Sequence, residues 1–174
     1  AGAYPVQAVE IMASVAAHAD AAVQEDGDAP SWERLSLLTA DHTRQFSEAI
    51  GWAAKRMTET MPVQSVVVFT KSGYSARSIS RSRPRAPIYA FALTEQARRR
   101  CALLWGVEAF CVEEINNLAI LDRKVDDVLV SHDLANTGDV VIIVAGTPLA
   151  VSGRTNLLRL HEVGEETRLA HGDA

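Results

Sequence analysis

The chain has 174 residues, of which 48% are hydrophobic and 22% charged, and its formal net charge is −5. This composition is typical of a soluble globular domain with room for a core, and the acidic balance argues against broad binding to nucleic acid or to an anionic membrane. No apolar run approaches the roughly 20 residues that a transmembrane helix needs. We therefore expect a cytoplasmic protein with neither a nucleic-acid nor a membrane partner.

A helical pattern opens the chain over residues 4–24. Pro5 suits the first turn of a helix, and Val9, Met12 and Val15 recur near one face. Many alanines occupy the rest of this segment. We therefore predict a helix that packs closely against a neighbour.

The sequence Glu-Asp-Gly-Asp-Ala-Pro at residues 25–30 breaks this pattern and predicts an exposed connector. It is the one plausible boundary, so we divide the chain into residues 1–28, a helix and its linker, and residues 29–174, a single α/β domain. The N-terminus, Ala-Gly-Ala-Tyr-Pro, has neither a basic region nor an initiator Met. We therefore expect no signal peptide, and a segment of a longer polypeptide.

A second helix is predicted from about residue 41 to residue 59, with Asp41 as its cap and Pro62 beyond its end. Its apolar residues recur at helical spacing: Phe46, Ala49, Ile50, Ala53 and Met57. Such a face could hold a ligand, but covering a sheet is the preferred interpretation.

From residue 66 onward, strands alternate with helices. The predicted strands are residues 66–69, 88–91, 107–112, 140–144 and 157–161, and the helices between them end near residues 83, 104 and 134, the second being capped by Thr94. This alternation predicts a three-layer, doubly wound α/β fold with a five-stranded, mostly parallel sheet. Because no helix separates the last two strands, we expect the fifth to be antiparallel and to lie at an edge.

Small hydroxyl residues and a glycine follow the first strand, at Thr70, Lys71, Ser72, Gly73 and Ser75. A turn of this kind before a helix can bind an anion, because the first N–H groups of the helix lack partners and glycine lets the main chain approach closely. Two interpretations stay open on this stretch. One is a phosphate cradle, and the other is an ordinary strand-to-helix turn with Ser72 as the N-cap.

A second loop rich in small residues, residues 146–156, follows the fourth strand. Ligands of open α/β sheets bind beyond the carboxyl ends of the strands, so the two loops could enclose one phosphorylated small molecule. The alternative for this loop is a wide β-turn before an edge strand.

Other polar residues predict little chemistry. Cys101 and Cys111 are interpreted as reduced, buried thiols, and the five histidines show no ligand spacing, so no metal site is expected. No nucleophile–base pair and neither common glycine-rich nucleotide motif is present. The acidic pairs 113–114 and 126–127 are interpreted as a loop pair and a solvated turn. A basic patch comprises Arg77, Arg81, Arg83 and Arg85, and we expect it to face another domain.

Several of these stretches resemble the C-terminal domain of pyruvate kinase. They are Val66–Arg77 (VVVFTKSGYSAR), Arg83–Ile88, Gly138–Val141, Gly146–Pro148 and Ser152–Leu157. The opening Tyr4–Met12 resembles the last helix of that enzyme's (β/α)₈ catalytic barrel. The resemblance therefore covers nearly the whole chain.

The resemblance implies a regulatory and assembly role, in which the domain binds a phosphorylated effector, meets the catalytic barrel and helps to form a homo-oligomer. The implied effector residues are Thr70, Lys71, Ser72, Gly73 and Ser75 in the first loop, and Ser152, Gly153, Arg154 and Thr155 in the second. Family members that bind a sugar bisphosphate use a Trp and an Arg after the third strand. Here Trp105 precedes that strand and Asn116-Asn117 occupies the neighbourhood, which favours a monophosphate of a sugar or a nucleoside.

The resemblance also implies that catalysis, with its Mg²⁺ and K⁺, belongs to the barrel, so we expect no cofactor in this chain and no activity from it alone. A second hypothesis is a stand-alone interaction module with a vestigial pocket, which assembles through its edge strand and alanine-rich helix. The third, an independent enzyme, would depend on Lys71 or Glu113 and is the weakest.

Overall fold

The computed structural model describes residues 2–25, 42–113, 117–148 and 154–165. It divides into two compact units, Ala1–Leu38 and Thr39–Ala174. Most of the predicted connector at residues 25–30 lies outside the described residues, as does Asp41.

The first unit contains helix α1, Pro5–Glu25, which confirms the predicted opening helix. Its large apolar side chains are exposed: Val6, Val9, Ile11, Met12 and Val15. None of the helices in the described part of the chain combines the length and the apolar character needed to cross a bilayer.

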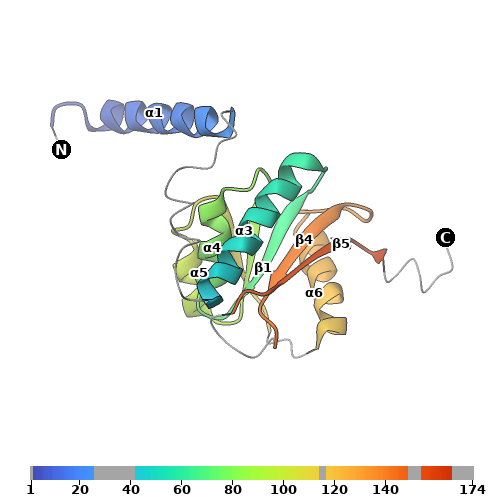
Figure 1. Ribbon diagram of the computed structural model, residues 1–174. Helices are drawn as coiled ribbons and strands as arrows, with labels where there is room; N and C mark the ends of the chain where they lie inside the picture. The colour runs from blue at the N-terminus through green and yellow to red at the C-terminus, as the bar shows by residue number, and fades with distance from the viewer. Residues whose placement is uncertain (1, 26–41, 114–116, 149–153, 166–174) are drawn as a thin grey trace. The chain divides into compact units, whose positions relative to one another are not determined.

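The second unit is built on a five-stranded sheet with the order β3-β2-β1-β4-β5 (Figure 1). The strands are β1 Ser65–Thr70, β2 Ile88–Ala92, β3 Val107–Cys111, β4 Val140–Ala145 and β5 Leu157–Glu162. The pairs β1–β2, β2–β3 and β1–β4 are parallel, whereas β4–β5 is antiparallel. The predicted fold class is therefore confirmed, including the antiparallel edge strand.

Helices cover both faces of this sheet, which gives three layers (Figure 1). The helices are α3 His42–Thr60, α4 Tyr74–Ser82, α5 Glu95–Cys101 and α6 Leu118–Ser131. One core cluster joins Ala54 of α3, Ile79 of α4 and Cys101 of α5 to β-strand residues such as Val66. The other joins α6, through Leu121 and its neighbours, to the opposite face of the sheet. Strands β1, β2 and β4 are buried on both faces and are continuous apolar runs, which is why the sequence identified them.

The buried face of α3 differs from the predicted one. Phe46 is 58% exposed, and Ala49 and Ala53 are exposed too, whereas the buried residues are Ser47, Gly51 and Ala54. Only Ile50 and Met57 of the predicted set pack against the core. The physical reason is a close contact between α3 and α4, which small residues permit.

Two distances define this contact. A Cβ added to Gly51 would lie 3.3 Å from Ser82 Oγ, tighter than most real contacts. The Ser78 hydroxyl donates a hydrogen bond to the carbonyl of Ser47 at 3.1 Å. The two helices therefore pack through small and hydroxyl side chains, a pattern that a search for large apolar residues misses.

Three smaller predictions are also corrected. Cys101 is buried, but Cys111 is exposed because it lies on the edge strand β3, and both thiols are free. Asp126 is not a solvated turn residue: it accepts hydrogen bonds from His161 Nε2 at 2.7 Å and from the Gly164 amide at 3.0 Å. Helix α5 ends at Cys101 rather than near residue 104, although Thr94 caps it as predicted, accepting from the Ala97 amide at 3.1 Å.

Candidate functional site

The carboxyl ends of β1 and β4 lie side by side where the strand order reverses. The chain winds from β1 through β2 to β3 on one side, and β4 then pairs with the free edge of β1. In open α/β sheets this reversal point is where ligands bind. The two loops that leave these ends are the two that the sequence selected, residues 70–75 and 146–156.

The first turn is shaped by Thr70 and Gly73. Thr70 Oγ1 accepts a hydrogen bond from the Gly73 amide at 2.9 Å, and Gly73 has a φ of 90°, a left-handed conformation that favours glycine. Gly73 is the N-cap of α4, and no side chain caps the helix, so the alternative with Ser72 as N-cap is wrong. Ser72 and Lys71 are exposed instead.

The two loops meet through a pair of hydroxyl groups. Ser75 Oγ and Thr155 Oγ1 lie 2.8 Å apart although 80 residues separate them, and both side chains are buried. One hydroxyl donates to the other, so the second keeps a proton with which to donate elsewhere. The predicted convergence of Ser75 and Thr155 is therefore present in the structure.

The base of the second loop is closed by Asn156. Its Oδ1 accepts from the Thr147 amide at 2.6 Å, and its Nδ2 donates to the Thr147 carbonyl at 2.9 Å. A Cβ on Gly146 would lie 2.1 Å from the Arg154 carbonyl oxygen, so only glycine permits this approach. Arg154 is exposed, whereas Ser152 and Gly153 lie outside the described residues.

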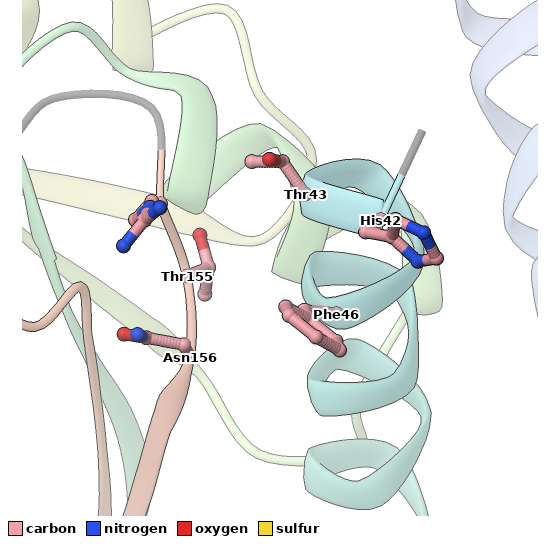
Figure 2. A pocket seen from close by; sticks show the side chains of 6 residues that line it. His42, Thr43, Phe46, Thr155 and Asn156 are labelled. Atoms are coloured by element: carbon pink, nitrogen blue, oxygen red, sulfur yellow. The ribbon is translucent and has the colours of Figure 1, made fainter. Parts of the chain in front are cut away.

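A hollow of about 170 Å³ lies between this loop and the first turns of α3. Figure 2 shows Phe46 pointing from α3 toward Thr155 and Asn156. The lining residues are His42, Thr43, Phe46, Arg154, Thr155 and Asn156. The sequence predicts an apolar face on this helix that includes Phe46 and could hold a ligand, but it cannot place that face beside residues 154–156, because the contact joins segments more than a hundred residues apart.

A second cavity, of about 330 Å³, lies on the α5 side of the first turn. It is lined by Ser72, Gly73, Tyr74, Arg77, Arg100 and Leu104. Arg100 was missed by the sequence reasoning. The available signal was the run Arg98-Arg99-Arg100 after Glu95, since a single carboxylate can pair with only part of such a run.

In α5, the carboxylate of Glu95 pairs with two of the three arginines. Arg98 and Arg99 donate hydrogen bonds to Glu95, and these bonds lower the pKa of the Glu95 carboxyl to about 2. At the other end of the helix, burial raises the pKa of the Cys101 thiol. Cys101 is therefore a protonated core residue at neutral pH and not a reactive thiolate.

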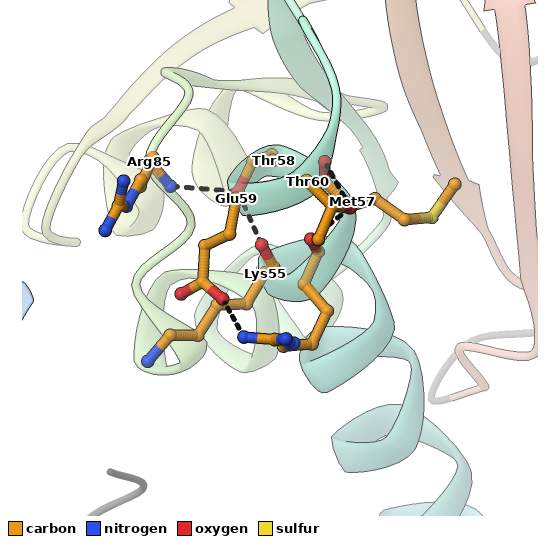
Figure 3. Close-up of polar contacts among 7 residues, drawn as sticks. Lys55, Met57, Thr58, Glu59, Thr60 and Arg85 are labelled. Atoms are coloured by element: carbon orange, nitrogen blue, oxygen red, sulfur yellow. Dashed lines mark hydrogen bonds and ion pairs between the residues drawn. The ribbon is translucent and has the colours of Figure 1, made fainter. Parts of the chain in front are cut away.

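The remaining predicted residues are placed away from these loops or serve the fold. Arg83 stacks on Trp105, with 4.6 Å between its guanidinium carbon and the ring centroid. Figure 3 shows the Arg85 amide donating to Thr58 Oγ1, at 3.0 Å, which ties the loop before β2 to the end of α3. Glu113 is exposed at the end of β3. Among the described residues, no group of three or more His, Cys, Asp or Glu side chains could hold a metal ion.

Comparison with known proteins identifies the family. Residues 48–161 match the family described as pyruvate kinase, alpha/beta domain. The chain is 33% identical over 171 residues to a pyruvate kinase of Lactobacillus delbrueckii subsp. bulgaricus, which covers 98% of this chain and 28% of that protein. It is 32% identical over 166 residues to a pyruvate kinase of Sporosarcina psychrophila, covering 95% of this chain and 27% of the relative.

A pyruvate kinase of Staphylococcus aureus (strain USA300) is 31% identical over 177 residues, covering 99% of this chain and 28% of the relative. The chain thus spans about 28% of the length of these curated relatives. The resemblance seen in the loop motifs is confirmed by the family match, which covers β1 through most of β5. The chain belongs to the pyruvate kinase family, to its C-terminal alpha/beta domain.

Proposed function

We propose that this chain binds a phosphorylated small molecule between its two loops and serves as the effector-binding and assembly domain of a pyruvate kinase. The observation that carries the proposal is the 2.8 Å contact between Ser75 and Thr155, which joins the two glycine-bearing loops at the reversal point of the sheet. Backbone N–H groups at the start of α4 face this end of the strands, and such groups favour phosphate.

Each residue has a role in this proposal. Gly73 and Thr70 set the backbone of the turn, Ser72 and Lys71 supply an exposed hydroxyl and a positive charge, and Ser75 shares its hydroxyl with the second loop. On that loop the proposed ligands of the effector are Ser152, Gly153, Arg154 and Thr155. The effector is a monophosphate of a sugar or a nucleoside.

In the parent enzyme, phosphoryl transfer from phosphoenolpyruvate to ADP, with Mg²⁺ and K⁺, belongs to a catalytic barrel domain. We infer that this barrel and further copies of the chain are the protein partners of the domain, in the cytoplasm. The chain by itself is expected to form no ATP from phosphoenolpyruvate and ADP. Measurable turnover by the purified chain would contradict the assignment of catalysis to the barrel domain.

The test of effector binding is a thermal-shift panel of sugar and nucleoside monophosphates. A ligand at about 100 times its Kd stabilises the folded state by about 2.7 kcal/mol, so at least one member of the panel should raise the Tm by several degrees. Ser72→Ala should weaken that response, while its own stability stays within about 0.5 kcal/mol of the parent because the side chain is exposed.

Ser131→Ala is the matched control, since Ser131 is an exposed serine at the end of α6. It should respond to the ligand like the parent. The proposal fails if no ligand of the panel shifts the Tm, or if Ser72→Ala and Ser131→Ala respond alike.

The exposed face of α1 favours the second candidate function, an interaction module with a vestigial pocket. Val9, Met12 and Val15 are each about 60% exposed, and apolar residues gathered on one helix favour packing against another surface. Sedimentation of the chain with and without phosphate ligands separates the two candidates. An oligomer that forms equally in both conditions, with no thermal response to any ligand, favours the module.

A further inference from the structure

The cavity between α4 and α5 carries a concentration of positive charge. Arg77 projects from the first turns of α4 and Arg100 from the last turn of α5, and both line the same space of about 330 Å³. Leu104 lines it as well and packs against the core beneath, and Tyr74 adds an aromatic side chain. The lining residues therefore include two guanidinium groups and no carboxylate.

Neither guanidinium group has a partner within the described part of the chain: no hydrogen bond or ion pair involves the side chain of Arg77 or Arg100 there. The two arginines that precede Arg100 in the sequence do have a partner. Arg98 and Arg99 are bound to Glu95 at 2.7 Å and 3.1 Å. The single carboxylate of α5 thus neutralises part of the arginine run, and Arg100, which lines the same cavity as Arg77, has no counter-charge among the described residues.

Two like charges on one concave surface are unfavourable unless an anion joins them. Guanidinium groups suit phosphate in particular, because their planar N–H groups can donate two parallel hydrogen bonds. The cavity volume is at the lower end of the range for small-molecule sites, and the chain is acidic as a whole. These properties favour a small phosphoryl group over a polyanion.

We propose that Arg77 and Arg100 form a phosphoryl-binding subsite on the α5 side of the turn at residues 70–73. The subsite adjoins the proposed effector site, since Ser72 and Gly73 line the cavity. Its occupant is a phosphoryl group, supplied either by a separate phosphate ion that binds beside the monophosphate effector or by a ligand with two phosphoryl groups that binds in place of that effector. Its existence does not depend on the proposed function, because the charge of the cavity comes from the two arginines.

Isothermal titration calorimetry of the whole chain at low ionic strength tests the subsite. The probes are inorganic phosphate, pyrophosphate and a sugar monophosphate, and the variants are Arg77→Gln and Arg100→Gln. Arg99→Gln is the matched control, because Arg99 is adjacent on α5 but bound to Glu95. Each variant removes one exposed charge, so all three should unfold at the same urea midpoint as the parent.

If one ligand spans both sites, pyrophosphate binds the parent at least tenfold more tightly than phosphate, and Arg77→Gln and Arg100→Gln each abolish that advantage. If the subsite holds a separate ion, inorganic phosphate still binds to a chain that is saturated with sugar monophosphate. Arg77→Gln and Arg100→Gln then lose this binding of phosphate but still bind the sugar monophosphate. In either case Arg99→Gln behaves like the parent.

The proposal is overturned if Arg77→Gln and Arg100→Gln bind phosphate and pyrophosphate as the parent does, or if Arg99→Gln loses as much affinity as they do. If the unsubstituted chain binds phosphate through Arg77 and Arg100 but binds none of the monophosphates, the proposed function is refuted and the proposal of the subsite is supported.

Discussion

The imidazole of His161 on β5 is 2% exposed, and its Nε2 lies 2.7 Å from Oδ1 of Asp126 on α6. The other carboxylate oxygen of Asp126 accepts from the Gly164 amide, at 3.0 Å. Strand β5 begins just after Thr155, the residue that meets Ser75. The pair of His161 and Asp126 therefore anchors to α6 the strand that carries one half of the candidate site.

Replacing Asp126 should destabilise the fold. Asp126→Ala leaves the buried imidazole and the Gly164 amide without their acceptor, a loss of about 2 to 3 kcal/mol. Urea unfolding measures the change. Asp127→Ala is the control, because Asp127 is exposed and should cost no more than about 0.5 kcal/mol. Equal stabilities of the two variants would show that Asp126 does not anchor β5.

The hydroxyl pair of Ser75 and Thr155 should behave as a coupled unit. Ser75→Ala and Thr155→Val each leave one buried hydroxyl without its partner and should each cost about 1 to 2 kcal/mol. The double variant removes both hydroxyls, so it should cost less than the sum of the two. A double-mutant cycle in urea measures the coupling energy, and strict additivity would mean that the contact contributes nothing to the fold.

The pH dependence of stability should contain a small contribution from Glu95. Its pKa is about 2 in the folded chain against an ordinary value of 4.5, because Arg98 and Arg99 donate hydrogen bonds to the carboxylate. A lowered folded pKa stabilises above the unfolded pKa, and the contribution is lost as the pH falls from about 4.5 toward 2.

Glu95→Gln should therefore flatten the stability profile in that acidic range only, and carboxyl NMR titration of the parent should place the Glu95 pKa well below its ordinary value of 4.5. Glu108→Gln, which changes another exposed carboxylate, should leave the slope at low pH nearer to that of the parent. A Glu95 pKa in the ordinary range would show that the two arginines do not hold the carboxylate in solution.

The two thiols should differ in reactivity. Cys111 is exposed on an edge strand, whereas Cys101 is buried and its pKa is raised by burial. A disulfide reagent at pH 8 should modify one thiol rapidly in the native chain and two after unfolding. Cys111→Ser should abolish the rapid reaction and Cys101→Ser should retain it. Rapid modification of two thiols in the folded chain would contradict the burial of Cys101.

Family membership, fold class and the two loops could be predicted because they depend on local patterns. Buried parallel strands are continuous apolar runs, and the turn at residues 70–75 carries its hydroxyls and glycine within six positions. The antiparallel edge strand followed from the missing crossover helix. Each of these signals is complete within a short stretch of chain.

Two of the three main errors share one cause. The N-cap of α4 is Gly73 and not Ser72, and the hydroxyl of Thr70 fixes the turn by accepting a hydrogen bond from the Gly73 amide. The buried face of α3 is set by the small residues of α4. Asp126 has a partner 35 residues away. In the cases of α3 and Asp126 the environment of a side chain depends on an element that is distant in the sequence, whereas the N-cap of α4 is decided by a contact within the turn itself.

The sequence by itself determined which segments form strands, which form helices, and which loops hold the residues that suit a phosphate. Only the tertiary structure decided that Ser75 meets Thr155, that Asp126 anchors His161, and that Arg77 and Arg100 line one cavity. The physical reason is that propensity and periodicity act over a few residues, whereas hydrogen bonds and charge pairs depend on distances in space that only the packed sheet and its helices define.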